Sequence, residues 1–274
     1  MTPALRPSPP VREALRRATA CLSQPATDFL EPLSCGIDLG TATIVLAVVD
    51  SQGVPVYVDQ LPSRALRDGV IVDFHGAAAT VARLKAAAEE ALGWRIDEAA
   101  TAYPPGVGAA ESRASRFVLE QAGLHCTDLL DEVTAANRFL GVDDGVIVDV
   151  GGGSTGVGVY EGGRLVSLGD RPGGGHHLDL ILAGTLKVTI EEAERLKREN
   201  GGEYLRVLRP GIERIATSIA ILTEGHSRLP LHLAGGALML PGAEEIIASY
   251  LERPVLAYEH ALLITPLGIA GRRA

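Results

Sequence analysis

The chain has 274 residues, a formal net charge of −9 at pH 7 and a sequence pI near 5.3. That length suffices for one large domain or two ordinary ones. A hydrophobic content of 46% with 22% charged residues excludes a disordered or fibrous chain. The acidic balance argues against a nucleic-acid-binding protein, which would carry a basic face. The 32 glycines, about 12% of the chain against an ordinary ~7%, indicate many turns and close backbone contacts.

Neither a membrane segment nor a disulfide framework is expected. No apolar run approaches the ~18 residues of a membrane span, and the N-terminus lacks the basic-then-apolar order of a signal peptide. Cys21, Cys35 and Cys126 are an odd number without CxxC spacing, so they are expected to be reduced structural thiols. These features predict a cytoplasmic protein without membrane partners.

The N-terminal segment is expected to precede the folded body. Residues 1–10 hold four prolines and are predicted to be extended or disordered, whereas residues 11–22 have helical periodicity. The apolar stripe of this helix consists of Val11, Leu15, Ala18 and Leu22. The helix could lie against its own domain or dock into a groove on a partner, and the sequence leaves both open.

The body begins with a strand, a turn and a second strand over residues 35–49, and another strand follows the polar turn at 50–53. The helices expected next cover residues 77–92, 110–122 and 129–140. The opening pattern then returns over residues 145–160, followed by the turn at 161–163. Residues 184–225 are expected to be mostly helical, and a strand and turn over 231–241 precede further helix.

The returning pattern is a pseudo-repeat at the scale of a domain. Each copy has an apolar strand, an aspartate, a glycine-containing loop with small hydroxyl residues, and a second strand. The two aspartates, Asp38 and Asp149, lie about 110 residues apart, which is the length of one α/β domain. The repeat therefore predicts two similar halves that face each other across a cleft.

Each copy also has the chemistry of a phosphate site. A tight turn rich in Gly, Thr and Ser exposes backbone N–H groups that can surround phosphate oxygens. The aspartate before each turn repels phosphate but can hold Mg²⁺ through water, because Mg²⁺ prefers oxygen ligands and keeps several waters. Asp38 and Asp149 are thus expected to serve a Mg²⁺-bound polyphosphate that the two loops clamp.

Five motifs resemble those of the actin/Hsp70/sugar-kinase ATPase superfamily, in the same order. They are two phosphate loops at 36–43 and 148–155, two connecting helices at 131–136 and 266–270, and an adenosine motif at 233–242. The resemblance implies an α/β actin-like ATPase (ribonuclease H-like) fold, with two similar lobes around a nucleotide cleft and small outer subdomains.

The lobe boundaries follow from these motifs. An N-terminal helical extension covers residues 1–33, the first lobe 34–140 and the second lobe 141–262. The connecting helix over residues 263–274 is expected to return to the first lobe.

Within this superfamily the chain resembles the EutJ family of ethanolamine-utilisation proteins. The segments with similar sequence are residues 67–74, 102–106, 174–177, 182–184 and 191–198. The resemblance implies an accessory chaperone or assembly factor for ethanolamine utilisation, with ethanolamine ammonia-lyase or bacterial-microcompartment proteins as partners and ATP with Mg²⁺ as cofactors.

The resemblance also implies roles for individual residues. Asp38 and Asp149 position the Mg²⁺-bound nucleotide, and Glu132 orients the attacking water, with no protein nucleophile required. The remaining residues implied to bind ATP are Gly40, Thr41, Ala42 and Thr43 at the β-phosphate, Gly151, Gly152, Gly153, Ser154 and Thr155 at the γ-phosphate, Gly174, Gly175 and His176 near the sugar or phosphates, Glu194 and Lys197 beside the adenosine, and Gly235, Gly236 and Leu238 at the base.

Simpler interpretations remain open for several of these residues. Glu132 could be an acidic residue in the first turn of a helix, and Glu194 and Lys197 could form an exposed i, i+3 pair. His176 and His177 have no further metal ligand at suggestive spacing, so a loop near the nucleotide is favoured over a metal site.

Two further positions have structural explanations. Asp179 is either a helix cap or a functional residue, and the charged run over residues 195–199 is expected to be a solvated helix face. Two departures from the superfamily pattern, Thr43 in place of a common Asn and Val133 in place of a common Pro, leave the hydrolysis rate open.

The leading functional hypothesis is an ATP-binding, slowly hydrolysing nucleotide switch. Nothing after the last motif corresponds to the substrate-binding domain of Hsp70, and only about 40 residues between Gly184 and Gly225 remain for an outer subdomain. A full chaperone cycle is therefore not expected. The alternatives are a non-enzymatic adaptor that docks to shell or cargo proteins through its N-terminal helix and, less favoured, a small-molecule kinase.

Overall fold

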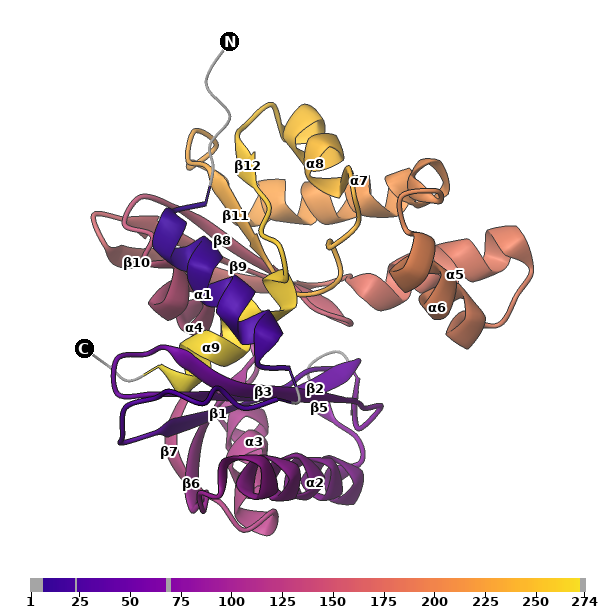
Figure 1. Ribbon diagram of the computed structural model, residues 1–274. Coiled ribbons are helices and arrows are strands. Elements are labelled where there is room, and N and C mark those ends of the chain that lie inside the picture. The colour runs from indigo at the N-terminus through magenta and orange to yellow at the C-terminus, as the bar shows by residue number, and fades with distance from the viewer. Residues whose placement is uncertain (1–6, 23, 68–69, 272–274) are drawn as a thin grey trace. The chain divides into compact units, whose positions relative to one another are not determined.

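A computed structural model describes residues 7–22, 24–67 and 70–271, which fold into two compact units. The first unit comprises Ser8–Gly141 together with the C-terminal segment that begins at Leu262, and the second comprises Val142–Ala261. Figure 1 shows a sheet with covering helices in each unit. The two-lobe α/β architecture expected from the repeat is confirmed.

The first unit is built on a five-stranded mixed sheet in the order β3-β2-β1-β6-β7. β1 pairs antiparallel with β2 and parallel with β6, and β7 extends the parallel part. The strands are β1 (Ser34–Leu39), β2 (Thr43–Val49), β3 (Pro55–Pro62), β6 (Glu98–Tyr103) and β7 (His125–Asp131), beside the two-residue strands β4 (Leu66–Arg67) and β5 (Val70–Ile71).

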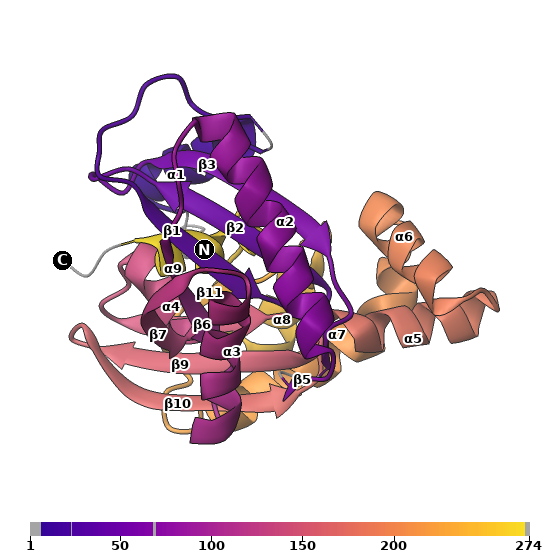
Figure 2. The same cartoon turned by 90° about the horizontal axis from the view of Figure 1, so that it is seen from below.

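Helices cover both faces of this sheet. α2 (Phe74–Leu92) and α3 (Ala109–Gln121) pack on one face, and Figure 2 shows them in front of the strands. α4 (Glu132–Leu140) and α9 (Ile264–Ala270), the latter preceded by the 3₁₀ turn η1 (Ala261–Leu263), pack on the other side. Because the sheet is covered on both faces, every residue of β2 is buried, as its continuous apolar sequence requires.

One predicted helix boundary is wrong. A helix was expected over residues 129–140, but the chain forms strand β7 up to Asp131 and the helix begins at Glu132. Leu129 and Leu130 instead pair with Thr101 and Ala102 of β6, so sheet pairing overrides the helical periodicity.

The N-terminal helix α1 (Pro9–Ala20) packs against β3 of the first unit. Its side chains Val11, Leu15 and Ala18 are buried, and Leu22 forms an isolated parallel bridge with Val58. This arrangement supports the interpretation that the helix lies against its own domain.

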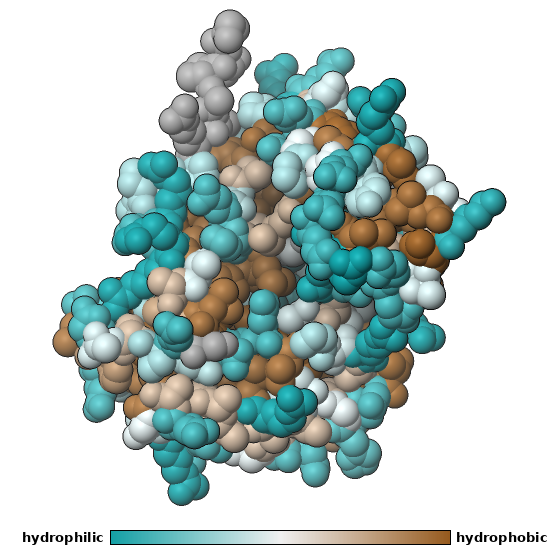
Figure 3. Space-filling view, turned by 45° about the vertical axis from the view of Figure 1, so that its right-hand side comes forward, coloured by the Kyte–Doolittle hydropathy of each residue, from teal (hydrophilic) through white to brown (hydrophobic). Residues whose placement is uncertain are grey.

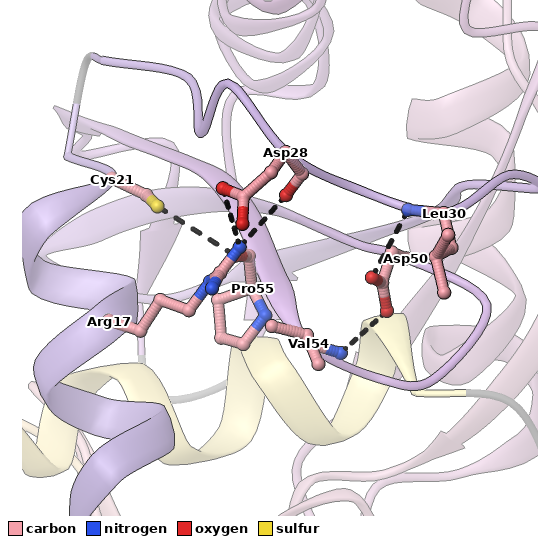
Figure 4. Close-up of polar contacts among 7 residues, drawn as sticks. All are labelled: Arg17, Cys21, Asp28, Leu30, Asp50, Val54 and Pro55. Atoms are coloured by element: carbon pink, nitrogen blue, oxygen red, sulfur yellow. Dashed lines mark hydrogen bonds and ion pairs between the residues drawn. The ribbon is translucent and has the colours of Figure 1, made fainter.

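Polar contacts hold the chain that follows α1 (Figure 4). Arg17 Nε donates to the Pro55 carbonyl oxygen at 3.0 Å, and its Nη2 donates to the Asp28 carbonyl oxygen at 3.0 Å. Asp50 accepts from the Leu30 and Val54 amides, which joins the segment before β1 to the β2–β3 turn. The helix therefore has specific backbone partners within its own unit.

The start of α1 also differs from expectation. The prolines were expected to keep residues 1–10 extended, but Pro9 and Pro10 form the first turn of the helix. Proline fits this position, because the first-turn amides have no intrahelical acceptor. Residues 1–6, on which most of the predicted extended segment falls, lie outside the described part of the chain.

The second unit is built on a sheet in the order β10-β9-β8-β11-β12. β8, β9 and β10 form an antiparallel meander, and β11 and β12 extend it in parallel with β8. The strands are β8 (Gly145–Val150), β9 (Ser154–Glu161), β10 (Arg164–Pro172), β11 (Leu231–Ala234) and β12 (Val255–Leu256). Its helices are α5 (Gly175–Leu186), α6 (Ile190–Asn200), α7 (Leu205–Leu222) and α8 (Ala243–Leu251).

The helices of the second unit pack on its sheet and on one another. α7 packs on β9 and β10, α8 packs on α7 and β12, and α5 and α6 pair with each other beside α7 (Figure 1). The core is aliphatic, with Val146, Val148, Leu178, Leu182 and Ile212 fully buried. The predominance of aliphatic side chains in this core agrees with the low aromatic content.

The cysteines and the surface behave as the composition predicts. Cys21, Cys35 and Cys126 are buried free thiols, and burial raises the pKa of Cys35 to about 12. Figure 3 shows hydrophilic residues over much of one face, with hydrophobic residues in groups between them. Among the described residues, no helix is both long and apolar enough to cross a membrane.

Candidate functional site

In the first unit, Asp38 stands near the end of β1, directly before a tight turn to β2. Leu39 pairs with Ile44, so only residues 40–43 are available to reverse the chain. A Cβ on Gly40 would lie 2.5 Å from the Thr43 carbonyl oxygen, so the turn requires glycine at this position. Asp38 is half-buried between the buried residues Ile37 and Leu39.

Glu132 follows β7, which is separated from β1 by β6, and it lies at the corresponding end of the sheet in the same unit. β1, β6 and β7 are parallel, and the carboxyl ends of parallel strands form one edge of a sheet, which is where α/β proteins bind ligands. Glu132 is the first residue of α4, whereas Asp131 caps this helix by accepting from the Thr134 amide at 2.8 Å. The structure thus shows the helix-start role of Glu132, and its catalytic role stays a prediction.

The second unit repeats the hairpin around Asp149. β8 and β9 pair from Gly145–Tyr160 to Val150–Thr155, which leaves residues 151–153 as the turn. Asp149 is only 7% exposed, lies opposite Gly156 and is adjacent to Ala234 of β11. Its carboxylate is therefore part of the sheet edge from which the glycine loop extends.

Residues 173–175, which follow β10, form a second turn that is hydrogen-bonded to this loop. The amides of Gly175, His176 and Gly173 donate to the carbonyl oxygens of Gly151, Gly152 and Gly153 at 3.0, 2.8 and 2.9 Å. A Cβ on Gly174 would lie 2.3 Å from the Gly151 carbonyl oxygen, so a side chain there would push the two turns apart. The predicted residues Gly174, Gly175 and His176 are thus brought against the predicted phosphate loop.

The predicted base-binding turn, from Gly235 to Leu238, packs against the same loop. Gly235 has φ +80°, a left-handed conformation that favours glycine, and a Cβ on it would lie 2.5 Å from Asp149 Oδ1. The Ala237 amide donates to the Val150 carbonyl oxygen at 3.1 Å. Asp149, the glycine loop and the turn from Gly235 to Leu238 therefore form one continuous backbone surface.

Lys197 and Glu194 differ from each other in their surroundings. Lys197 is buried, with its Nζ 2.6 Å from Asp179 Oδ1, whereas Glu194 forms a partly exposed ion pair with Arg198 at 2.6 Å. The interpretation of Lys197 as half of an exposed i, i+3 pair with Glu194 is therefore wrong. The solvated face predicted over residues 195–199 is confirmed for Arg195, Arg198 and Glu199, which are exposed, and is wrong for Lys197.

Asp179 is not a helix cap. α5 begins at Gly175 with Gly174 as its N-cap, which places Asp179 in the second turn, buried at 4% exposure. Burial raises the pKa of its carboxyl, and the charge and hydrogen bond of Lys197 partly offset that rise. The cap interpretation failed because the helix starts earlier than the sequence indicates.

Asp170 is a candidate site residue that the sequence does not single out. It lies opposite Gly156 in the β9–β10 ladder, and burial, together with the nearby Asp149 charge, raises its pKa to about 6 against a hydrogen bond from Ser154. Within the described part of the chain, Asp170 Oδ1 is buried without a hydrogen-bond partner. Only strand register brings Asp170 near Asp149, so no motif could reveal it.

The histidines do not form a metal centre. His176 is exposed, His177 is half-buried, and their ring centroids are 6.5 Å apart. No group of three or more His, Cys, Asp or Glu residues arranged to hold a metal occurs in the described ranges. The donor set fits a hydrated Mg²⁺ better, because each unit offers one carboxylate near the end of a strand that leads into a glycine-containing turn.

Comparisons with known proteins identify relatives of the chain. Residues 59–205 match the family model of MreB/Mbl protein, and residues 146–266 match that of cell division protein FtsA. Ethanolamine utilization protein EutJ of Salmonella typhimurium is 40% identical over 257 residues, which cover 93% of this chain and 91% of that relative.

Solved structures extend the comparison. The crystal structure of ethanolamine utilization protein EutJ from Carboxydothermus hydrogenoformans has a TM-score of 0.91 and 39% identity, covering 95% of this chain and 97% of its own. MreB 5 of Spiroplasma citri bound to AMPPNP has a TM-score of 0.70 at 18% identity, covers 89% of this chain and 95% of its own, and shows the fold alone. The chain therefore has the actin-like ATPase fold and belongs to the family of ethanolamine utilization protein EutJ.

Proposed function

We propose that the protein is a nucleotide switch that binds ATP with Mg²⁺, hydrolyses it slowly and serves as an accessory factor in ethanolamine utilisation. The observation that carries this proposal is the glycine cradle of the second unit. There Asp149, the loop over residues 151–155, the turn over 173–175 and Gly235 share one backbone surface.

The cradle suits phosphate because its walls are backbone. Side chains at Gly174 or Gly235 would collide with the backbone of residues 150–152, whereas glycines let these segments pack together. A glycine-rich loop packed in this way can present backbone N–H groups to phosphate oxygens. The Asp149 carboxylate would repel a phosphate directly and would instead accept hydrogen bonds from water around the cation. Mg²⁺, when bound, supplies positive charge that neutralises the phosphate oxygens.

Hydrolysis needs positioning more than covalent chemistry. Glu132 is the residue that would accept a hydrogen bond from the attacking water and orient it, at the carboxyl edge that also carries Asp38. Thr43, whose side chain is buried at the end of the first turn, would hold that turn in shape. Slow turnover is part of the proposal, since a single carboxylate orients the water.

The accessory role rests on the family. A nucleotide that favours one conformation of a two-lobed protein changes the surface offered to partners. Ethanolamine ammonia-lyase and microcompartment proteins are the partners proposed for such a surface, in the cytoplasm. The burial of the apolar residues of α1 does not favour the alternative adaptor, which needs them for docking.

The test is calorimetric titration of the purified protein with ATP in the presence of Mg²⁺. Asp149→Asn should lose binding at least tenfold, because it removes the carboxylate charge without changing the side chain's shape. Asp143→Asn, an exposed position in the same unit, is the matched control and should bind like the wild type. If titration of the wild-type protein with ATP gives no heat of binding, with or without Mg²⁺, nucleotide binding is refuted.

A further inference from the structure

Lys197 is a buried lysine with one ion-pair partner and one hydrogen-bond acceptor. It lies on α6 at 7% exposure, with Nζ 2.6 Å from Asp179 Oδ1 on α5, and it donates to the Gly175 carbonyl oxygen at 2.9 Å. We infer that Lys197 is a positioning residue, which holds the Gly173–Gly175 turn against the phosphate loop instead of contacting the nucleotide.

The contacts run without a gap from Lys197 to the loop. Its ammonium fixes the carbonyl of Gly175, and the amides of Gly175 and His176 donate to the carbonyl oxygens of Gly151 and Gly152. These two donors lie in the same turn as the carbonyl that Lys197 holds. A shift of that carbonyl therefore moves the groups that support the loop.

The ammonium also lies where three segments meet. A Cβ on Gly175 would lie 3.3 Å from Lys197 Nζ and 3.4 Å from the Ala237 Cβ, and the Ala237 amide donates to the Val150 carbonyl oxygen. The glycine at 175 leaves the room that the ammonium occupies. Lys197 is thus adjacent to the turn, and the turn to both the loop and the base-binding segment.

Burial determines which role Lys197 can have. A buried ammonium is stable only while it is paired and hydrogen-bonded, and both requirements are met inside the protein. Two of its three N–H groups have partners inside the protein, and a displacement of the ammonium towards adenosine would leave Asp179 as a buried unpaired carboxylate. Asp179 therefore holds Lys197 in place, and Lys197 holds the turn.

The first experiment is independent of nucleotide. In amide hydrogen exchange on nucleotide-free protein, Lys197→Met should increase exchange at Gly175 and His176 by about tenfold or more, the worth of one hydrogen bond from a charged donor. Arg198→Met, the neighbouring exposed position on α6, should leave both amides unchanged. Unchanged protection in Lys197→Met would overturn the inference.

The second experiment separates positioning from stability. Lys197→Met leaves Asp179 unpaired and should lower the urea midpoint, whereas Lys197→Met with Asp179→Leu removes both charges and should recover most of it. The double variant still lacks the donor to the Gly175 carbonyl, so fast exchange at Gly175 and His176 should persist. Recovery of both properties together would show a structural ion pair only.

The consequence for ATP rests on the proposed function. The double variant should bind Mg·ATP about tenfold to a hundredfold more weakly, because a charge-assisted hydrogen bond that orders the loop is lost, while its affinity for adenosine should not change. An equal loss for adenosine would indicate direct contact with the nucleoside and overturn the inference. Failure of wild-type protein to bind either ligand would refute the proposed function and leave the exchange result to decide the role of Lys197.

Discussion

Gly268 of α9 lies directly against the backbone of Ala135 in α4: a Cβ on Gly268 would be 1.8 Å from the Ala135 carbonyl oxygen. On another side of the same helix, a Cβ on Gly36 would lie 2.4 Å from the Ala270 amide nitrogen. α9 is therefore packed backbone to backbone between α4 and β1 of the first unit. The packing depends on two glycines far apart in sequence.

Gly268→Ala should destabilise the first unit by about 3 kcal/mol or more, because overpacking a close helix contact forces backbone shifts. Urea unfolding followed by circular dichroism measures the change. Gly184→Ala is the matched control, since Gly184 is an exposed glycine in α5 with open space around it. That control should raise stability by roughly 0.5–1 kcal/mol, and a Gly268→Ala variant as stable as the wild type would contradict the packing.

The sequence predicted those parts of the protein that have local signals. The Asp38 and Asp149 hairpins, the Gly-rich loops and most helices follow from periodicity and turn residues. The clasp of Gly175 on Gly151 was not predictable, because a hydrogen bond between two loops depends on how β9 and β10 pair.

The sequence also did not predict which charged side chains are buried. Lys197 lies in a run of charged residues, and only the packing of α6 on α5 distinguishes it from exposed Arg198. Asp170 has no motif around it and acquires its significance from register with Gly156. The surroundings of both residues depend on tertiary contacts, which produce no periodic pattern in the sequence.

Leu15→Ala should destabilise the protein by about 2–4 kcal/mol, the usual cost of removing a fully buried leucine side chain. Leu15 of α1 is 2% exposed, and the helix contacts β3 in its own unit. Thermal unfolding measures the effect, with exposed Arg12→Ala as the control. If α1 instead served only to bind a partner, Leu15→Ala would leave the melting temperature unchanged.

Asp170→Asn should raise the melting temperature at pH 8 and have no stabilising effect at pH 4. The pKa of Asp170 is raised from 3.8 to about 6, chiefly by burial, so the folded protein retains a proton that the unfolded chain has released. Stability therefore falls as pH rises from about 4 to 6, and an amide removes this penalty. Thermal scans without Mg²⁺ measure it, and Asp143→Asn, which keeps Asp170, should show the wild-type pH dependence.

His232 should have the opposite effect on the pH dependence of stability, since it destabilises the folded protein as the pH falls. Burial lowers its pKa from 6.5 to about 4, and its Nδ1 lies 2.6 Å from the Tyr258 hydroxyl. The folded protein keeps the ring neutral while the unfolded chain protonates it below pH 6.5, so stability is present above pH 6.5 and is lost as pH falls towards 4, by on the order of 2–3 kcal/mol.

His232→Gln should flatten that loss between pH 6.5 and 4, at a cost of about 1 kcal/mol at pH 8 for the weakened contact with Tyr258. Urea midpoints measured at half-unit pH intervals give the slope. The exposed residue His75 provides the comparison, and His75→Gln should keep the wild-type slope. A His232→Gln variant with an unchanged acid slope would mean that the imidazole is protonated in the folded protein, and the contact with Tyr258 would then have to be made by an imidazolium donating to the hydroxyl.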